Sequence, residues 1–166
     1  KVWYGAPGGM GAAKFEAAFK STVPELFDGQ PDLLFHLITM IGPHDLLDRG
    51  ANICRAVQMP GEFIITFPQA YHGGFSLGFN CAEAVNFATV DWLPFARACA
   101  ERHRIYHRPP IFSLDELVFR TIRSPFFQVK TCKWEALLLL IDLKETIDRE
   151  KQVRKKLQKL LGKPVQ

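Results

Sequence analysis

The pattern of apolar and polar positions predicts several short strands in the first half of the chain. These segments are rich in Val, Ile, Phe and Thr, residue types that favour strands. Gly and Pro separate them with tight turns, a pattern typical of a double-sheet jelly roll or cupin-like barrel. The predicted strands are Lys1–Ala6, Ile53–Gln58, Glu62–Phe67, Tyr71–Phe75 and Phe79–Asn86.

Apolar residues at helical spacing predict helices between and after these strands. Ser113 and Glu116 form a capping box at the start of one helix, and Asp91 is the expected cap of another. Gly50 and Gly162 are expected to end helices as left-handed caps. The predicted helices are Gly11–Thr22, Pro31–Met40, Pro43–Arg49, Leu93–His103, Leu114–Ile122 and Lys133–Leu161.

Composition places the chain among ordinary globular proteins. Its 166 residues, 48% of them hydrophobic and 23% charged, suffice for one domain with a short extension. The longest apolar run, Ala136–Ile141, is too short to cross a membrane. The four cysteines form no C-x-x-C pair, so neither a zinc knuckle nor a redox motif is indicated.

Charge is concentrated at the C-terminal end. Residues 149–166 contain seven Lys or Arg side chains and one acidic residue, while the rest holds fourteen basic and sixteen acidic side chains. The basic character therefore belongs to the tail, which we interpret as a solvated helix face. We do not expect direct nucleic-acid contact by this tail. The chain begins at Lys1, inside a predicted strand and without a signal peptide, so we expect it to be cut from a longer protein.

One histidine, His72, lies between the apolar arms of the segment Gly61–Phe87. Neutral imidazole offers one directed lone pair, which makes a histidine at the mouth of a small barrel a possible metal ligand. Most single histidines on strands are packed or solvated, however, and spacing alone leaves both interpretations open. We interpret His36 and His44, in predicted helices, as structural.

Longer motifs carry a resemblance to a known family. Three segments, which start at Lys1, Gly61 and Gly78, resemble the second half of a JmjC domain. Their sequences are KVWYGAP, GEFIITFPQAYHGGF and GFNCAEAVNF. PELF, QPDLL and VDWLP, which start at Pro24, Gln30 and Val90, resemble the JARID branch of histone lysine demethylases. The likeness covers roughly residues 1–120.

The resemblance implies a fold and a division of the chain. We expect a mixed α+β fold, the C-terminal part of a double-stranded β-helix of the jelly-roll or cupin-like type with inserted helices. Residues 1–108 would be the C-terminal half of the JmjC domain. Residues 109–166 would be a helical extension with a basic tail.

The resemblance also implies roles for four residues. JmjC demethylases hold Fe(II) on two histidines and one carboxylate, and His72 matches the second histidine. Lys1 matches a lysine that pairs with the far carboxylate of the cosubstrate 2-oxoglutarate. Trp3 matches an aromatic residue that packs beside this cosubstrate. Asn86 matches a polar residue near the rim of the site. Without the resemblance, Lys1 would be an ordinary exposed strand residue and Trp3 plain core.

The sequence departs from the family pattern in two respects. Gly73 stands where the family commonly has Ser or Ala, and Ser76 stands where it commonly has Asn. These two differences put the methyl-state preference in doubt. The His-x-Asp/Glu pair that supplies the other two iron ligands is missing. The residues two places after the five histidines are Ile, Leu, Gly, Ile and Pro. We therefore expect the chain alone to be inactive and its parent to be an enzyme.

The function implied for the parent is demethylation of methyl-lysine on histone H3, with lysine 4 as the expected position. Fe(II) and 2-oxoglutarate would hydroxylate the N-methyl carbon, which then leaves as formaldehyde. The expected partners are the methylated H3 tail and chromatin complexes, with no membrane. A nuclear chromatin regulator of transcription fits this reading. The alternatives are a non-catalytic JmjC chromatin scaffold, a JmjC protein hydroxylase and, last, a nucleic-acid module built on the basic tail.

Overall fold

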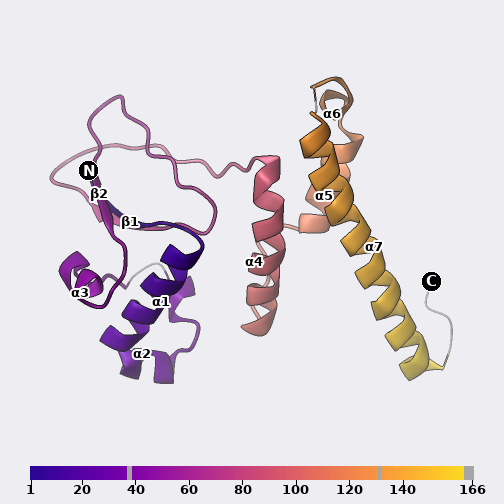
Figure 1. Cartoon of the computed structure of the whole chain (residues 1–166), viewed down its shortest axis with the longest axis horizontal. Helices are drawn as coiled ribbons and strands as arrows, with labels where there is room; N and C mark the ends of the chain where they lie inside the picture. Colours follow the sequence, from indigo (N-terminus) through magenta and orange to yellow (C-terminus); the bar gives the residue numbers. More distant parts are fainter. Residues whose placement is uncertain (37–38, 131, 163–166) are drawn as a thin grey trace. The chain divides into compact units, whose positions relative to one another are not determined.

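The computed structural model describes residues 1–36, 39–130 and 132–162. The chain forms two compact units, Lys1–Val85 and Asn86–Gln166, of which the first contains the sheet and the second is helical (Figure 1). A mixed fold with a small antiparallel sheet agrees with the coarse prediction. The predicted division into residues 1–108 and 109–166 concerns the extent of the family domain and stays a prediction.

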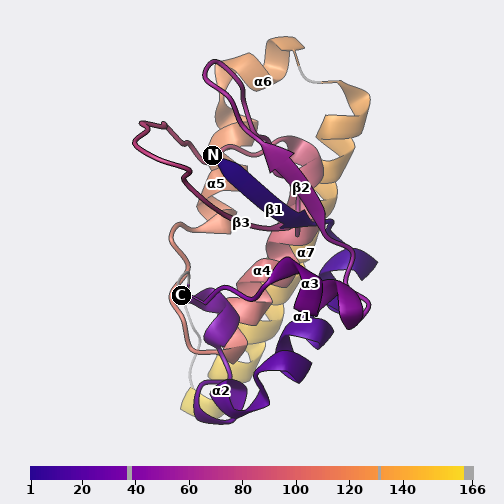
Figure 2. The same cartoon turned by 90° about the vertical axis from the view of Figure 1, so that its left-hand side faces the viewer.

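The first unit is organised around its N-terminal strand. Strand β1 (Val2–Ala6) is the central strand of a three-stranded sheet, between β2 (Cys54–Val57) and β3 (Tyr71–Phe75). Both pairings are antiparallel. Figure 2 shows β1 and β2 side by side and pointing in opposite directions. Val2 and Ala6 are each 2% exposed, because alternate side chains of a central strand share one buried face.

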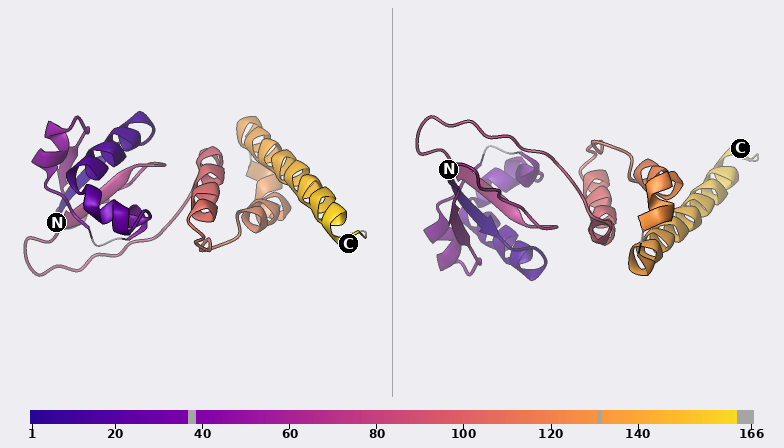
Figure 3. Two further views of the ribbon diagram at one scale, coloured as in Figure 1. Left: turned by 90° about the horizontal axis from the view of Figure 1, so that it is seen from below. Right: turned by 90° about the horizontal axis from the view of Figure 1, so that it is seen from above.

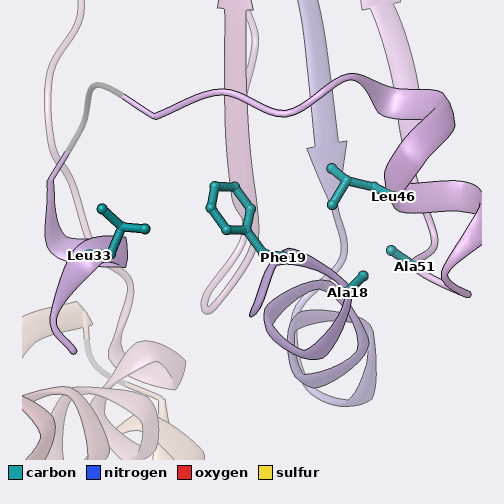
Figure 4. Packing of buried hydrophobic residues seen from close by; sticks show 5 residues of the cluster. All are labelled: Ala18, Phe19, Leu33, Leu46 and Ala51. Atoms are coloured by element: carbon teal, nitrogen blue, oxygen red, sulfur yellow. The ribbon is translucent and has the colours of Figure 1, made fainter. Parts of the chain in front are cut away.

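Helices pack around this sheet and enclose a small apolar core. Its buried members come from different parts of the unit, and Figure 4 shows them converging: Ala18, Phe19, Leu33, Leu46 and Ala51. Burying a side chain such as Phe19 stabilises the fold by roughly 1.5–3 kcal/mol. The elements are α1 (Met10–Thr22), α2 (Pro24–Gly29), the 3-10 helix η1 (Leu33–Phe35) and α3 (Pro43–Asp48).

The predicted helix Pro31–Met40 is wrong over the part of it that the structure describes. Only η1 is helical, and the backbone turns to an extended conformation at His36. The imidazole of His36 contacts the amide of Gln30 at 2.5 Å and lies 3.6 Å from a carboxylate oxygen of Asp32. These local polar contacts favour a turn over a continued helix. Leu37 and Ile38, which the prediction counted as buried helical positions, lie outside the described residues.

The predicted strands Glu62–Phe67 and Phe79–Asn86 are also wrong, since neither segment has regular secondary structure. Their aromatic side chains are exposed, with Phe63 at 91% and Phe67 at 76%. Strand propensity reflects a side chain's fit to a half-buried, hydrogen-bonded surface. Neither segment pairs with a strand among the described residues, so neither has the backbone hydrogen bonds that a strand requires.

The second unit is a group of helices with its own core of Leu93, Val118 and Leu139. No described helix of the chain is both long and apolar enough to span a membrane. The elements are η2 (Val90–Trp92), α4 (Leu93–Ile105), α5 (Leu114–Arg123), α6 (Pro125–Lys130) and α7 (Lys133–Leu161).

Capping explains which helix boundaries the sequence predicts. The Ser113 hydroxyl accepts a hydrogen bond from the Glu116 backbone N–H at 3.2 Å, as the capping box requires. Gly162, with φ of 64°, ends α7 in the left-handed conformation. The predicted cap Asp91 is wrong, because it lies within η2 and no side chain caps α4. Helices α2 and α6 were not predicted, since each begins at a proline that resembles a stop signal.

A partly buried ion-pair network joins three helices of the second unit. Arg97 of α4 donates two hydrogen bonds, of 2.7 and 2.6 Å, to the carboxylate of Asp142 on α7, which is 5% exposed. Arg97 also contacts Asp115 of α5 at 2.6 Å and the hydroxyl of Thr146. Arg149 approaches the same Asp115 carboxylate at 3.0 Å.

This network shifts the ionisation of its members. The hydrogen bond from Arg97 to Asp142 raises the pKa of the guanidinium above its ordinary value, against the opposing effect of burial. Burial by itself raises the pKa of Asp115. The hydrogen bonds and charges of Arg97 and Arg149 outweigh that effect, so the pKa of Asp115 lies below its ordinary value. Both shifts favour the charged forms of Arg97 and Asp115.

Candidate functional site

Two of the predicted site residues, Trp3 and His72, come from the adjacent strands β1 and β3 of the first unit. In the pairing of β1 with β3, Gly5 lies opposite His72 and Trp3 lies opposite Gly74. Residues opposite one another and those two apart project from the same face of a sheet. His72 and Trp3 therefore share a face, and their ring centroids are 6.0 Å apart.

Lys1 extends this group along the same face. Its ammonium Nζ lies 4.8 Å from the centroid of the Trp3 ring, a cation–π contact worth about 0.5–1 kcal/mol at an accessible site. Lys1, Trp3 and His72 therefore form a row of a cation, an indole and an imidazole, in which the imidazole comes from β3. The predicted cosubstrate lysine and aromatic are adjacent in the structure.

Gln58 orients the indole ring and was missed by the sequence analysis. Its side-chain oxygen accepts a hydrogen bond of 2.8 Å from Trp3 Nε1, and its backbone carbonyl accepts one of 3.0 Å from the main-chain nitrogen of Lys1. It follows β2 directly, at a position that alternation along the strand puts on the Trp3 face. That alternation was the available signal, because an indole N–H that is partly buried requires an acceptor.

Close backbone packing brings β3 against β1 beside His72. A Cβ atom at Gly74 would lie 2.3 Å from the carbonyl oxygen of Val2, a distance that no side chain tolerates. At Gly73 a Cβ atom would meet nothing within 4 Å. The glycine at 74 is therefore required by the sheet, and the glycine at 73 is not.

The opposite face of the sheet is anchored by α1. Phe15 stacks on Tyr71 at the start of β3, with ring centroids 4.6 Å apart. The Tyr71 hydroxyl donates a 2.7 Å hydrogen bond to the carboxylate of Glu16. These contacts fix the residue that precedes His72, and they hold β3 in register on the side away from Trp3.

A cavity of about 440 Å³ in the first unit borders His72. Its lining includes two histidines, His36 and His72, together with aromatic and aliphatic side chains such as Tyr4, Phe15 and Leu33. The described lining residues include no Asp or Glu. The cavity therefore lacks the carboxylate that a facial triad needs.

The described residues do not fit a complete iron centre. No group of three or more His, Cys, Asp or Glu side chains within the described ranges could hold a metal ion. His72 offers one imidazole donor, whereas a facial triad takes two histidines and a carboxylate. Of the three donors of such a centre, the described residues at this place offer only the imidazole of His72.

Asn86, the fourth predicted site residue, lies at the start of the second unit and is exposed. It belongs to no strand. Its predicted role at the rim of a site stays a prediction, as do the roles of Lys1, Trp3 and His72.

Comparison with known proteins agrees with the motifs. Residues 1–87, about half of the chain, match the family described as JmjC domain, hydroxylase. Lysine-specific demethylase 5B of Gallus gallus is 46% identical over 161 residues, 96% of this chain. Lysine-specific demethylase JMJ17 of Arabidopsis thaliana is 50% identical over 118 residues, or 71% of the chain. Lysine-specific demethylase 5D of Homo sapiens is 48% identical over 125 residues, or 75%.

The chain spans only a small part of these relatives. It corresponds to 10% of the length of the Gallus gallus and Arabidopsis thaliana proteins and 8% of the Homo sapiens protein. What the relatives do as whole proteins therefore does not transfer to these 166 residues directly.

Proposed function

The chain belongs to the JmjC hydroxylase family, and on that premise we propose that it is part of an Fe(II)- and 2-oxoglutarate-dependent histone lysine demethylase. The observation that carries the proposal is the row formed by Lys1, Trp3 and His72 on one face of the sheet. It combines a cation able to pair with a carboxylate, an aromatic ring and an imidazole able to bind a metal.

Each residue of the row has a distinct role in this proposal. The Lys1 ammonium pairs with the far carboxylate of 2-oxoglutarate, and Trp3, oriented by Gln58, packs beside the cosubstrate. His72 donates an imidazole nitrogen to Fe(II), and Asn86 belongs to the rim. Bound Fe(II) and 2-oxoglutarate supply the oxidation that hydroxylates an N-methyl carbon, which is then lost as formaldehyde.

The remaining parts of the site come from outside these residues. We assign the missing His-x-Asp/Glu ligands to the longer parent protein, because the described residues hold no metal cluster. The three-stranded sheet would then be part of a double-stranded β-helix. Residues 1–108 would complete the JmjC domain, and residues 109–166 would follow it as the helical extension.

The proposed substrate is methyl-lysine on histone H3, with lysine 4 as the expected position. Relatives that carry the name lysine-specific demethylase support the reaction class. Outside residues 149–166 acidic side chains slightly outnumber basic ones, sixteen to fourteen, which suits a basic peptide. The proposed partners are the H3 tail and chromatin complexes, and the proposed location is the nucleus.

The decisive test replaces His72 in the full-length protein that contains this chain. We expect His72→Ala to lower formaldehyde release from a methylated H3 peptide by about 100-fold or more, because the centre loses a ligand. Bound iron should fall in parallel. His44→Ala is the matched control, since this histidine is exposed on α3 of the same unit and should leave both quantities unchanged.

Other results would overturn the proposal. If His72→Ala kept both its activity and its bound iron, His72 would not be an iron ligand. A wild-type protein that binds the peptide but releases no formaldehyde would be a chromatin scaffold. Incorporation of oxygen into a protein substrate without loss of a methyl group would identify a protein hydroxylase instead.

A further inference from the structure

Helix α7 carries a seam at seven-residue spacing along its whole length. Leu139, Thr146, Val153 and Leu160 are each seven residues apart, which is close to two helical turns. A second row, Leu143, Glu150 and Leu157, follows each of the first three by four residues. Together these rows alternate by four and three residues, the spacing of a coiled-coil seam.

Only the first half of this seam is covered. Leu139 and Thr146 are 2% and 8% exposed, in the part of α7 that packs with the other helices of its unit. Further along, Val153 is 44% exposed, Leu157 39% and Leu160 82%. We call these three residues the exposed seam. Both views in Figure 3 show this end of α7 extending past α5 within the second unit.

Basic side chains flank the exposed seam on both sides. At the spacing of a coiled coil, Arg149 and Lys156 border it on one side and Arg154 on the other. Residues 149–161 hold six Lys or Arg side chains and one carboxylate, Glu150. Arg149 and Arg154 have ion pairs with Asp115 and Glu150.

We propose that the exposed seam of α7 docks an acidic amphipathic helix of another protein. The apolar row would be buried against the partner's apolar row, as in other helix-docking interfaces. Glu or Asp side chains flanking the partner's seam would face Arg154 and Lys156. Charge complementarity of this kind selects the partner and its orientation.

The same observations disfavour three other occupants, namely a second copy of α7, a membrane surface and a nucleic acid. A second copy of α7 would place basic flanks against basic flanks in either orientation, which is repulsive. Residues 147–161 contain no Trp, Phe or Tyr, whereas helices that lie in a membrane surface usually carry aromatic residues on the apolar face. A nucleic acid bound through its phosphates would leave the apolar row exposed to water.

The test uses the full chain and a labelled acidic peptide of about four heptads, with Ile at a, Leu at d and Glu at e and g. We expect micromolar binding by fluorescence anisotropy that weakens as salt is raised. The variant Val153→Ser/Leu157→Ser should bind about tenfold more weakly, because it removes apolar surface from the interface.

Two charge reversals distinguish docking from simple charge attraction. Arg154→Glu/Lys156→Glu alters the flanks of the seam, while Lys151→Glu/Lys155→Glu alters the outer face by the same net charge. Only the first should weaken peptide binding by about tenfold, with helix content unchanged by circular dichroism. Equal loss from both reversals, or no peptide binding, would overturn the proposal. So would tighter binding to duplex DNA or anionic phosphatidylserine vesicles than to the peptide.

Discussion

Two neighbouring glycines after His72 have different reasons for being glycine. Gly73 and Gly74 both lie within the predicted strand Tyr71–Phe75, and both are strand residues in the structure. A side chain at 74 would collide with the Val2 carbonyl, while a side chain at 73 would meet open space. Only the approach of two strands that are distant in sequence separates the two positions.

We therefore expect Gly74→Ala and Gly73→Ala to differ. Gly74→Ala should lower the free energy of unfolding of the first unit by about 2 kcal/mol, because the methyl group forces β3 away from β1. Gly73→Ala, the matched control, should change it by less than about 0.5 kcal/mol.

Urea titrations that follow the fluorescence of Trp3, with Trp92 and Trp134 replaced by Phe, would measure both variants in the first unit. Equal effects of the two substitutions would show that the close contact at Gly74 relaxes at little cost.

At the scale of elements, the Arg97 network fixes how α4, α5 and α7 pack. Asp142 lies on the inner face of α7, where an isolated carboxylate would be strongly destabilising. Its two hydrogen bonds from Arg97 make that burial tolerable. The partners are separated by 45 residues in sequence. Helical periodicity can identify a buried face, but it does not identify the partner across the interface.

Replacing Asp142 alone should lower the free energy of unfolding more than replacing Arg97 and Asp142 together. We expect Asp142→Leu to lower the free energy of unfolding by about 3 kcal/mol, because Arg97 loses its main partner in a buried position. The double variant Arg97→Met/Asp142→Leu should recover most of that loss. Thermal unfolding followed by far-UV circular dichroism would measure both.

Arg104→Met is the control for charge removal on the same helix. Its ion pair with Glu101 is exposed and screened by water, so the substitution should leave the thermal unfolding temperature nearly unchanged. A double variant as unstable as the single one would mean that Asp142 serves the fold through contacts other than Arg97.

At the scale of the whole molecule, one imidazole does not make an oxidation centre. We expect the isolated 166-residue chain, supplied with Fe(II), 2-oxoglutarate, oxygen and a methylated H3 peptide, to release no formaldehyde above the background of free iron. The His72→Ala chain should give the same background. Release that depends on His72 would contradict this prediction and would require a different ligand set.

Local signals in the sequence determined much of the structure. Capping residues and long periodic runs predicted α5 and α7 closely, because the interactions that start and end a helix lie within a few residues of one another. The composition of strand β1 likewise predicted it. The role of His72 as an iron ligand is implied by the resemblance alone and stays a prediction. The family followed from motifs of this kind.

Tertiary structure alone decided whether apolar segments became strands and which side chains met. Residues 62–67 and 79–86 have strand composition but no ladder among the described residues, since a strand depends on hydrogen bonds to a neighbour that the segment does not contain. The row of Lys1, Trp3 and His72, the acceptor Gln58 and the Arg97–Asp142 pair all join distant parts of the chain. Such contacts depend on register and packing, which local sequence does not specify.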